Sequence, residues 1–147
     1  MPFIRIMVHL IWSTKDKESI IVPCLKPTLL DHLKSNAKEK NIWIDTINCV
    51  SDHVHALISL GAEQSISKVG MLLKGESSHW INKNDLTKTK FEWQDEYIAI
   101  SVSESNVETV KRYILNQEEH HRKKSFAEEC DEFLKKYGEG IVLDRCG

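Results

Sequence analysis

Residues 3–12 read FIRIMVHLIW, and every position except Arg5 and His9 carries an apolar side chain. In a strand, side chains alternate between the two faces, so this segment is apolar on both of them. That pattern is typical of a strand in the middle of a sheet, covered on both sides. We therefore expect an interior strand at residues 3–12.

The segments that follow alternate between helix and strand patterns. Apolar residues at a spacing of four predict one helix that ends near residue 40 and another over residues 65–82. Alternating apolar residues predict strands at 42–47, 54–60 and 97–102, the first two joined as a hairpin.

Two capping boxes predict the starts of two further helices. Ser105 with Glu108 precedes an apolar stripe, and Ser125 with Glu128 opens a last helix. The element order is then β-α-β-β-α-β followed by two helices. This order predicts an α+β, ferredoxin-like split βαβ fold with an antiparallel sheet and extra C-terminal helices, in a single domain over residues 1–147.

Composition excludes several classes of protein. With 41% hydrophobic and 29% charged residues, the chain is neither disordered nor collagen-like nor a coiled-coil rod. The net charge of −2 excludes a general polycation but leaves room for a local basic surface. The longest apolar run is too short to span a bilayer, and the four cysteines form no CxxC pair. We expect a cytoplasmic protein with reduced thiols and no membrane partner.

The sequence Asp52-His53-Val54-His55 lies at the start of the strand predicted over residues 54–60. Residues two apart point to the same face of a strand, so His53 and His55 can share one cation while Val54 points into the core. The alternative is that the two histidines lie on a half-exposed strand and have no role. The His-x-His pair alone does not decide between a cation site and this alternative.

A second candidate group is Tyr113 and Gln117, on the helix that follows the fourth strand. The spacing i, i+4 puts both side chains on one side of the helix, at the border of its apolar stripe. The alternative is a tyrosine at the core margin and a glutamine on the surface.

Basic residues could contact DNA in two places. The cluster HHRKK at 120–124, preceded by Lys111 and Arg112, is either a phosphate-contacting patch or a solvated helix end. Lysines near Trp80 and Trp93 could form a surface with aromatic platforms for single-stranded bases, although Trp80 fits an apolar stripe. His9 and His32 indicate only packing or surface roles. The residues that we expect to contact DNA are Lys74, Arg112, His120, His121, Arg122 and Lys123.

In combination these motifs are much more specific than each is alone. A His-hydrophobic-His strand followed by a helix with Tyr-x-x-x-Gln resembles the single-tyrosine HUH transposases of the smallest bacterial insertion sequences. The matching segments are HLIWSTK (9–15), SDHVH (51–55), KGESS (74–78), FEWQ (91–94), SVSES (101–105) and YILNQEEHH (113–121). One position departs from the family, which usually has Gly before the Tyr of the fourth strand; here Glu96 precedes Tyr97.

The resemblance implies roles for these residues. Tyr113 would attack a DNA phosphate and form a covalent 5′-phosphotyrosine, so that single-stranded DNA with hairpin ends is cut and rejoined without ATP. His53, His55 and Gln117 would bind a divalent ion. Two imidazoles and an amide oxygen leave coordination positions open, which suits Mg²⁺ or Mn²⁺ better than structural zinc. The resemblance also implies a homodimer whose active sites are shared between subunits.

Three alternatives remain open on the sequence. The chain could be a domesticated relative that acts at repeats in its host genome. It could be a hairpin-binding module that has lost catalysis. It could also be an unrelated metallohydrolase that uses His53, His55 and either His120 or His121.

Overall fold

Within the described residues, four strands form an antiparallel sheet in the order β2-β3-β1-β4. The computed structural model describes residues 2–118, 128, 131–132 and 135. The strands are β1 (Ile6–Ser13), β2 (Trp43–Cys49), β3 (His53–Leu60) and β4 (Ile98–Val102). This topology confirms the predicted α+β split βαβ fold with an antiparallel sheet.

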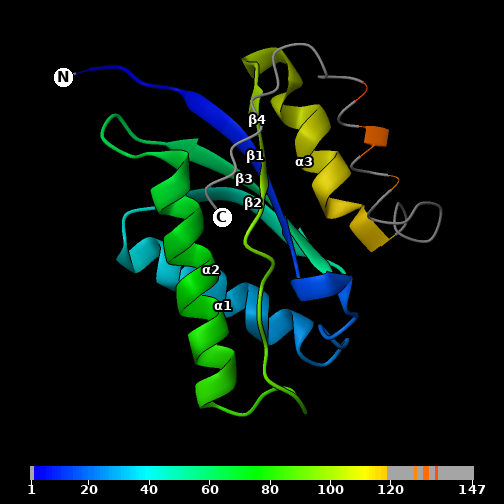
Figure 1. Ribbon diagram of the computed structural model, residues 1–147. Coiled ribbons are helices and arrows are strands. Elements are labelled where there is room, and N and C mark those ends of the chain that lie inside the picture. The colour runs from blue at the N-terminus through cyan, green and yellow to red at the C-terminus, as the bar shows by residue number, and fades with distance from the viewer. Residues whose placement is uncertain (1, 119–127, 129–130, 133–134, 136–147) are drawn as a thin grey trace.

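Helices cover both faces of this sheet. Helices α1 (Lys26–Glu39) and α2 (Ile66–Lys83) lie on one face, and α3 (Val107–Leu115) lies over the other (Figure 1). The larger core cluster joins even-numbered residues of β1 and β3 to α1 and α2. Its members include Leu10, Trp12, Val54, Ala56, Ile58, Leu29, Leu33, Val69 and Leu73. The smaller cluster, on the α3 face, consists of Met7, Leu57, Val107 and Ile114.

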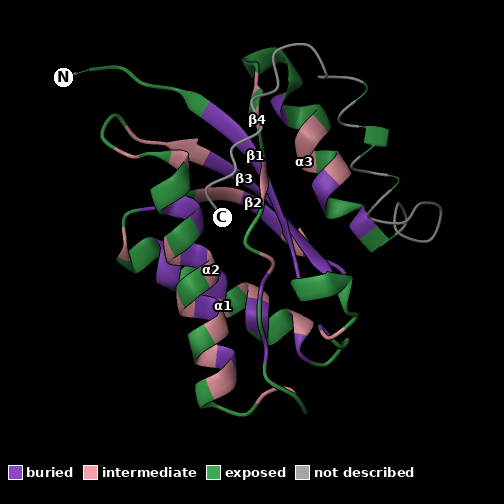
Figure 2. Cartoon of the chain, viewed as in Figure 1, coloured by how far each residue is buried: buried purple, intermediate pink, exposed green. Residues whose placement is uncertain are grey.

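Strand β1 occupies the interior position that the apolar run predicts. It pairs with β3 on one side and β4 on the other, and its residues from Met7 to Ser13 are buried (Figure 2). The strand begins at Ile6 rather than at Phe3, because its partner strands end there. Strand β3 ends at Leu60, which lies opposite Ile6, and β4 ends at Val102, which lies opposite Met7. Phe3 accordingly is 99% exposed.

The predicted hairpin of β2 and β3 is confirmed, with one irregularity. The register shifts between Ile44 and Thr46, so Asp45 is an extra residue on β2. At the other end, the Val50 N–H donates to the His53 carbonyl over 3.0 Å and closes the turn. Strand β3 therefore begins at His53, which places both histidines at its first positions.

The capping box predicted for Ser105 and Glu108 is wrong. A short 3₁₀ turn, η2 (Glu104–Asn106), precedes α3, and the N-cap residue Asn106 makes no side-chain capping bond. The Asn106 side chain instead donates to the Ser103 hydroxyl over 3.1 Å. Glu104 is held by Arg5, whose Nε lies 2.8 Å from its carboxylate. These contacts stabilise a turn that the helix signal alone does not predict.

The last predicted helix, which Ser125 opens, lies largely outside the described residues. In the part of the chain that the structure does describe, no helix has both the length and the apolar character needed to cross a membrane.

Candidate active site

The histidine pair lies on the α3 face of the sheet. Alternation along β3 directs Val54 and Ala56 into the core under α1 and α2, as predicted for Val54. His53 and His55 point to the opposite face, and both side chains are fully buried. Their ring centroids are 5.0 Å apart. The sequence pattern therefore correctly predicted that the two imidazoles lie together.

A carboxylate orients the first imidazole. Nδ1 of His53 lies 2.7 Å from Oδ1 of Asp52, within a buried contact. A carboxylate accepts hydrogen bonds, so Nδ1 carries the proton and donates a hydrogen bond to Asp52. The lone pair of this ring is then on Nε2, which is the atom that could ligate a metal.

A third histidine orients the second imidazole. Nε2 of His9, on β1, lies 2.9 Å from Nδ1 of His55. His9 is only 3% exposed, and its ring centroid lies 5.1 Å from that of His55. The sequence analysis gave His9 only a packing or surface role, and that interpretation was wrong. The available signal was a titratable residue inside an otherwise apolar strand, but its partner is 46 residues away.

Tyr113, from α3, faces these rings in the same chain. Its ring centroid lies 5.7 Å from that of His55 and 6.1 Å from that of His9, both in edge-on geometry. The side chain is half-buried, so its hydroxyl belongs to a site that borders solvent. The structure thus brings together the nucleophile candidate and the histidines.

Gln117 lies just beyond α3. The helix ends at Leu115 with Asn116 as its C-cap, and helical residues resume at Gln117, so the uninterrupted helix that the sequence predicted is broken by one residue. The side-chain amide of Gln117 donates to the Tyr113 carbonyl over 3.2 Å. Gln117 is fully buried, so the alternative of a surface glutamine is wrong.

The amide oxygen of Gln117 is buried and has no hydrogen-bond partner among the described residues. Leaving a buried acceptor unsatisfied costs on the order of 1–3 kcal/mol. A bound cation would satisfy this oxygen, and hard divalent ions prefer oxygen ligands. This is the observation in the structure that fits a metal site.

The donor set determines which ions suit the site. Among the described residues, no group of three or more His, Cys, Asp or Glu side chains is arranged to hold a metal ion. The available set is instead two imidazoles, of His53 and His55, with one neutral amide oxygen, of Gln117. If these three groups bound one ion, they would leave positions open for water and phosphate oxygens, which would suit Mg²⁺ or Mn²⁺.

Contacts at its C-terminal end hold α3 over the sheet. The side chain of Asn48, on β2, donates to the carbonyls of Ile114 and Leu115 over 2.9 and 3.3 Å. Lys26 at the start of α1 pairs with Glu118 over 2.7 Å. Asn48 also lies directly opposite His55 in the sheet. It is a positioning residue that the sequence analysis missed, because no motif marks it.

Two of the residues predicted to contact DNA, Lys74 and Arg112, lie among the described residues and do not share a surface. Lys74 lies on α2 and Arg112 on α3, on opposite faces of the sheet (Figure 1). The Lys74 ammonium donates to the Asp95 carbonyl over 2.8 Å, and burial holds the pKa of this lysine below its ordinary value. His120, His121, Arg122 and Lys123 lie outside the described residues.

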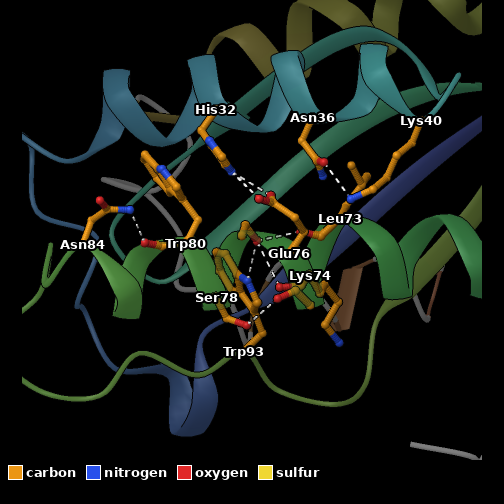
Figure 3. Close-up of polar contacts among 12 residues, drawn as sticks. His32, Asn36, Lys40, Leu73, Lys74, Glu76, Ser78, Trp80, Asn84 and Trp93 are labelled. Carbon is orange, nitrogen blue, oxygen red and sulfur yellow. Dashed lines mark hydrogen bonds and ion pairs between the residues drawn. The ribbon is translucent and has the colours of Figure 1, made fainter.

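The tryptophans near Lys74 are packed and do not form exposed platforms. The Trp80 ring stacks on His32 with centroids 3.8 Å apart, and His32 contacts both carboxylate oxygens of Glu76 at 2.7 and 2.9 Å (Figure 3). The Trp93 indole N–H donates to the Ser77 hydroxyl over 2.9 Å, and Trp93 is 8% exposed. This cluster joins α1 to α2 as part of the scaffold.

Known proteins resemble this chain in sequence and in fold. A family model described as transposase, IS200-like, matches residues 3–117. The chain is 28% identical over 114 residues to the ISDra2 transposase TnpA of Deinococcus radiodurans. The aligned region covers 74% of this chain and 81% of that protein.

Two solved structures have a similar fold. One, from Deinococcus radiodurans and assigned as a transposase, gives a TM-score of 0.65 at 25% identity and covers 79% of this chain and 93% of that chain. The other is a REP-associated tyrosine transposase bound to a REP hairpin, with a TM-score of 0.63 over 82% of this chain and 72% of that chain; at 12% identity it shows the fold alone. Because the family model matches residues 3–117 of the 147-residue chain, the protein belongs to the family of IS200-like transposases.

Proposed function

We propose that this chain cleaves and rejoins single-stranded DNA, with Tyr113 as nucleophile and a divalent ion held by His53, His55 and Gln117. The observation that carries the proposal is the position of Tyr113, whose ring lies 5.7 Å from that of His55 within one chain. The buried amide oxygen of Gln117, which lacks a hydrogen-bond partner among the described residues, supports the ion. A hairpin-binding module without catalysis would not require this arrangement.

The reaction is an exchange of phosphodiester bonds. The Tyr113 phenol loses its proton, its oxygen attacks the scissile phosphorus, and the bond from phosphorus to the 3′ oxygen breaks. The leaving 3′ oxygen takes up a proton, so the products are a 5′-phosphotyrosine and a free 3′-hydroxyl. Because the covalent bond conserves the phosphodiester, another 3′-hydroxyl can reverse the step without ATP.

The bound ion would act as a Lewis acid that stabilises charge developing on the phosphate. The protein's part is to hold the ligands in position. An ion bound at Nε2 of His53 and His55 requires a proton on each Nδ1. Asp52 and His9 lie at hydrogen-bond distance from these Nδ1 atoms and would accept from them, which fixes the orientation of both rings. Gln117 is held by its own bond to the Tyr113 carbonyl, which couples the nucleophile's backbone to the third ligand.

The proposed substrate is single-stranded DNA that folds into hairpins at its ends. The structurally similar REP-associated transposase was solved bound to a REP hairpin, which supports this class of partner. A chain with a net charge of −2 would gain little affinity from general phosphate attraction. We therefore expect recognition by hairpin shape and a few bases. A cytoplasmic location and a single domain over residues 1–147 remain predictions.

The proposed assembly is a homodimer, as the family resemblance implies. Its active sites would be shared if each Tyr113-bearing helix reached the partner's histidines. In the single chain, α3 packs on its own sheet through Val107 and Ile114 and through the bonds from Asn48. This docking supports a site built within one subunit, and the shared site is the alternative that an exchange experiment distinguishes.

The first prediction concerns the substitution Tyr113→Phe. It removes only the attacking hydroxyl, so the fold and the affinity for hairpin DNA should persist while the covalent adduct disappears. The measurement is a denaturing gel of labelled hairpin-bearing oligonucleotides incubated with Mg²⁺, with a mobility-shift assay as the binding control. A Phe variant that still cuts at the wild-type rate would show that Tyr113 is not the nucleophile.

The second prediction concerns the ion. His53→Ala and His55→Ala should each abolish cleavage but leave hairpin binding largely intact, because the ion serves the transition state. Gln117→Ala should be milder, since water can replace a neutral amide oxygen. Chelation with EDTA should stop cleavage by the wild type, and undiminished cleavage in EDTA would rule out the metal mechanism.

The third prediction concerns His9. Replacing it by leucine removes the bond to His55 Nδ1 and should weaken binding of Mn²⁺ by about 10- to 100-fold. The matched variant His9→Gln keeps an acceptor and should recover much of that affinity. Titration of Mn²⁺, followed by electron paramagnetic resonance of the free ion, measures this without any turnover. Equal affinities for the Leu and Gln variants would mean that His9 only fills space.

The fourth prediction concerns assembly. Tyr113→Phe protein is mixed with a His53→Ala, His55→Ala double variant under conditions in which subunits exchange. If the site is shared, a mixed dimer contains one intact combination of histidines and tyrosine, and cleavage should partly return. If each chain builds its own site, every site in the mixture is defective and no cleavage product forms.

A further inference from the structure

The ladder between β1 and β4 contains a gap next to the histidine pair. Strand β4 pairs with β1 as far as Ile98 opposite Ile11, and the chain meets β1 again where Trp93 bridges Thr14. Four residues, 94–97, therefore lie opposite two residues of β1. The Gln94 N–H still donates to the Ser13 carbonyl over 2.9 Å, and residues 95–97 have no pairing partner on β1. The gap widens into a cavity of about 510 Å³.

This cavity borders the candidate active site. Its floor includes Ile11 and Ser13, which lie directly opposite His55 and His53 in the register of β1 and β3. Side chains of directly opposed residues share one face of a sheet, with Cβ atoms roughly 4.5–5.5 Å apart. Helix α3 contacts β2 and β3, whereas the cavity lies at the gap between β1 and β4.

Strained backbone forms one wall of the cavity. Asp16 and Lys17 both have φ of 56°, a left-handed conformation that is uncommon for residues other than glycine. The turn is held by a bond from the Asp16 N–H to Gln94 Oε1 at 3.3 Å and by one from the Lys15 N–H to the Glu92 carbonyl at 3.0 Å. Strain of this kind persists where surrounding contacts enforce it, often at ligand sites.

The chemistry of the lining favours a base over a phosphate. Two carboxylates, of Asp16 and Glu96, line the cavity beside a single ammonium, of Lys17. Carboxylates repel a phosphate but accept hydrogen bonds from the exocyclic amino groups of cytosine and adenine. The side-chain oxygen Oε1 of Gln94 already accepts a hydrogen bond from the Asp16 N–H, and Tyr97 is among the residues that line the cavity. The volume lies within the usual range for small-ligand sites, roughly 300–1,000 Å³.

We propose that this cavity binds the nucleobase next to the scissile phosphate and that Glu96 makes it select a base with an exocyclic amino group over thymine. The proposal rests on the proposed DNA cleavage, because it specifies part of that substrate.

The test uses oligonucleotides with a fixed hairpin and randomised flanking nucleotides, incubated with the full chain and Mg²⁺. Covalent adducts are isolated, and both the captured and the released strands are sequenced. We expect thymine to be disfavoured at one position beside the cleavage point by at least about fivefold. Glu96→Gln should relax that preference at the same position, since an amide offers donors as well as an acceptor. Glu96→Gly should relax it too.

The control variant is Glu63→Gln, which makes the same charge change at an exposed position outside the cavity lining and should keep the wild-type preference. A parallel selection sequences the DNA that the protein binds at equilibrium, without cleavage. Adducts with the same base preference in wild type and Glu96→Gln would overturn the subsite and leave the proposed function standing. A Glu96-dependent preference in the bound pool without any adduct would support the subsite and overturn the cleavage. Absence of both would overturn both.

Discussion

The pairing of β1 with β3 is the constraint on which the site depends. Its register aligns Ile11 with His55 and Ser13 with His53. Because side chains alternate between the faces of a strand, a slip of one residue would move both histidines into the apolar core and expose Val54. Val54 is fully buried under α1 and α2, so the packing that stabilises the fold opposes this slip. The same strand pairing therefore positions the core residues on one face of the sheet and the histidine pair on the other.

Helix α3 completes the site because apolar contacts hold it against this sheet. The ion pair between Lys26 and Glu118 has side chains 21% and 67% exposed, and exposed pairs contribute only about 0–1 kcal/mol. Full burial of a side chain such as Ile114 contributes about 1.5–3 kcal/mol. The bonds from Asn48 add direction, because they satisfy carbonyls at the helix end that would otherwise lack partners. Tyr113 is thus carried by an element anchored to the strand beside His55.

The histidines lie between two regions of different character. On one side, α3 and the residues just after it present a half-buried tyrosine and a buried glutamine, held by apolar packing and by the bonds from Asn48. On the other side, the gap between β1 and β4 leaves a polar cavity whose wall includes Glu96. A DNA strand that reaches the histidines would pass from the second region to the first. The scaffold of α1 and α2, with its His32–Glu76 contact, stays on the opposite face of the sheet.

Local periodicity was enough to predict the interior strand, the hairpin and the shared orientation of His53 and His55, because each depends only on alternation along a few neighbouring residues. The i, i+4 spacing likewise brought Tyr113 and Gln117 to one side, although the helix is interrupted at Asn116. The sequence by itself did not reveal His9, because its contact with His55 depends on how strands 46 residues apart align. The turn before α3, the anchoring by Asn48 and the cavity beside Glu96 were decided by the tertiary structure alone. Each arises from packing between segments distant in sequence, which local propensities do not encode.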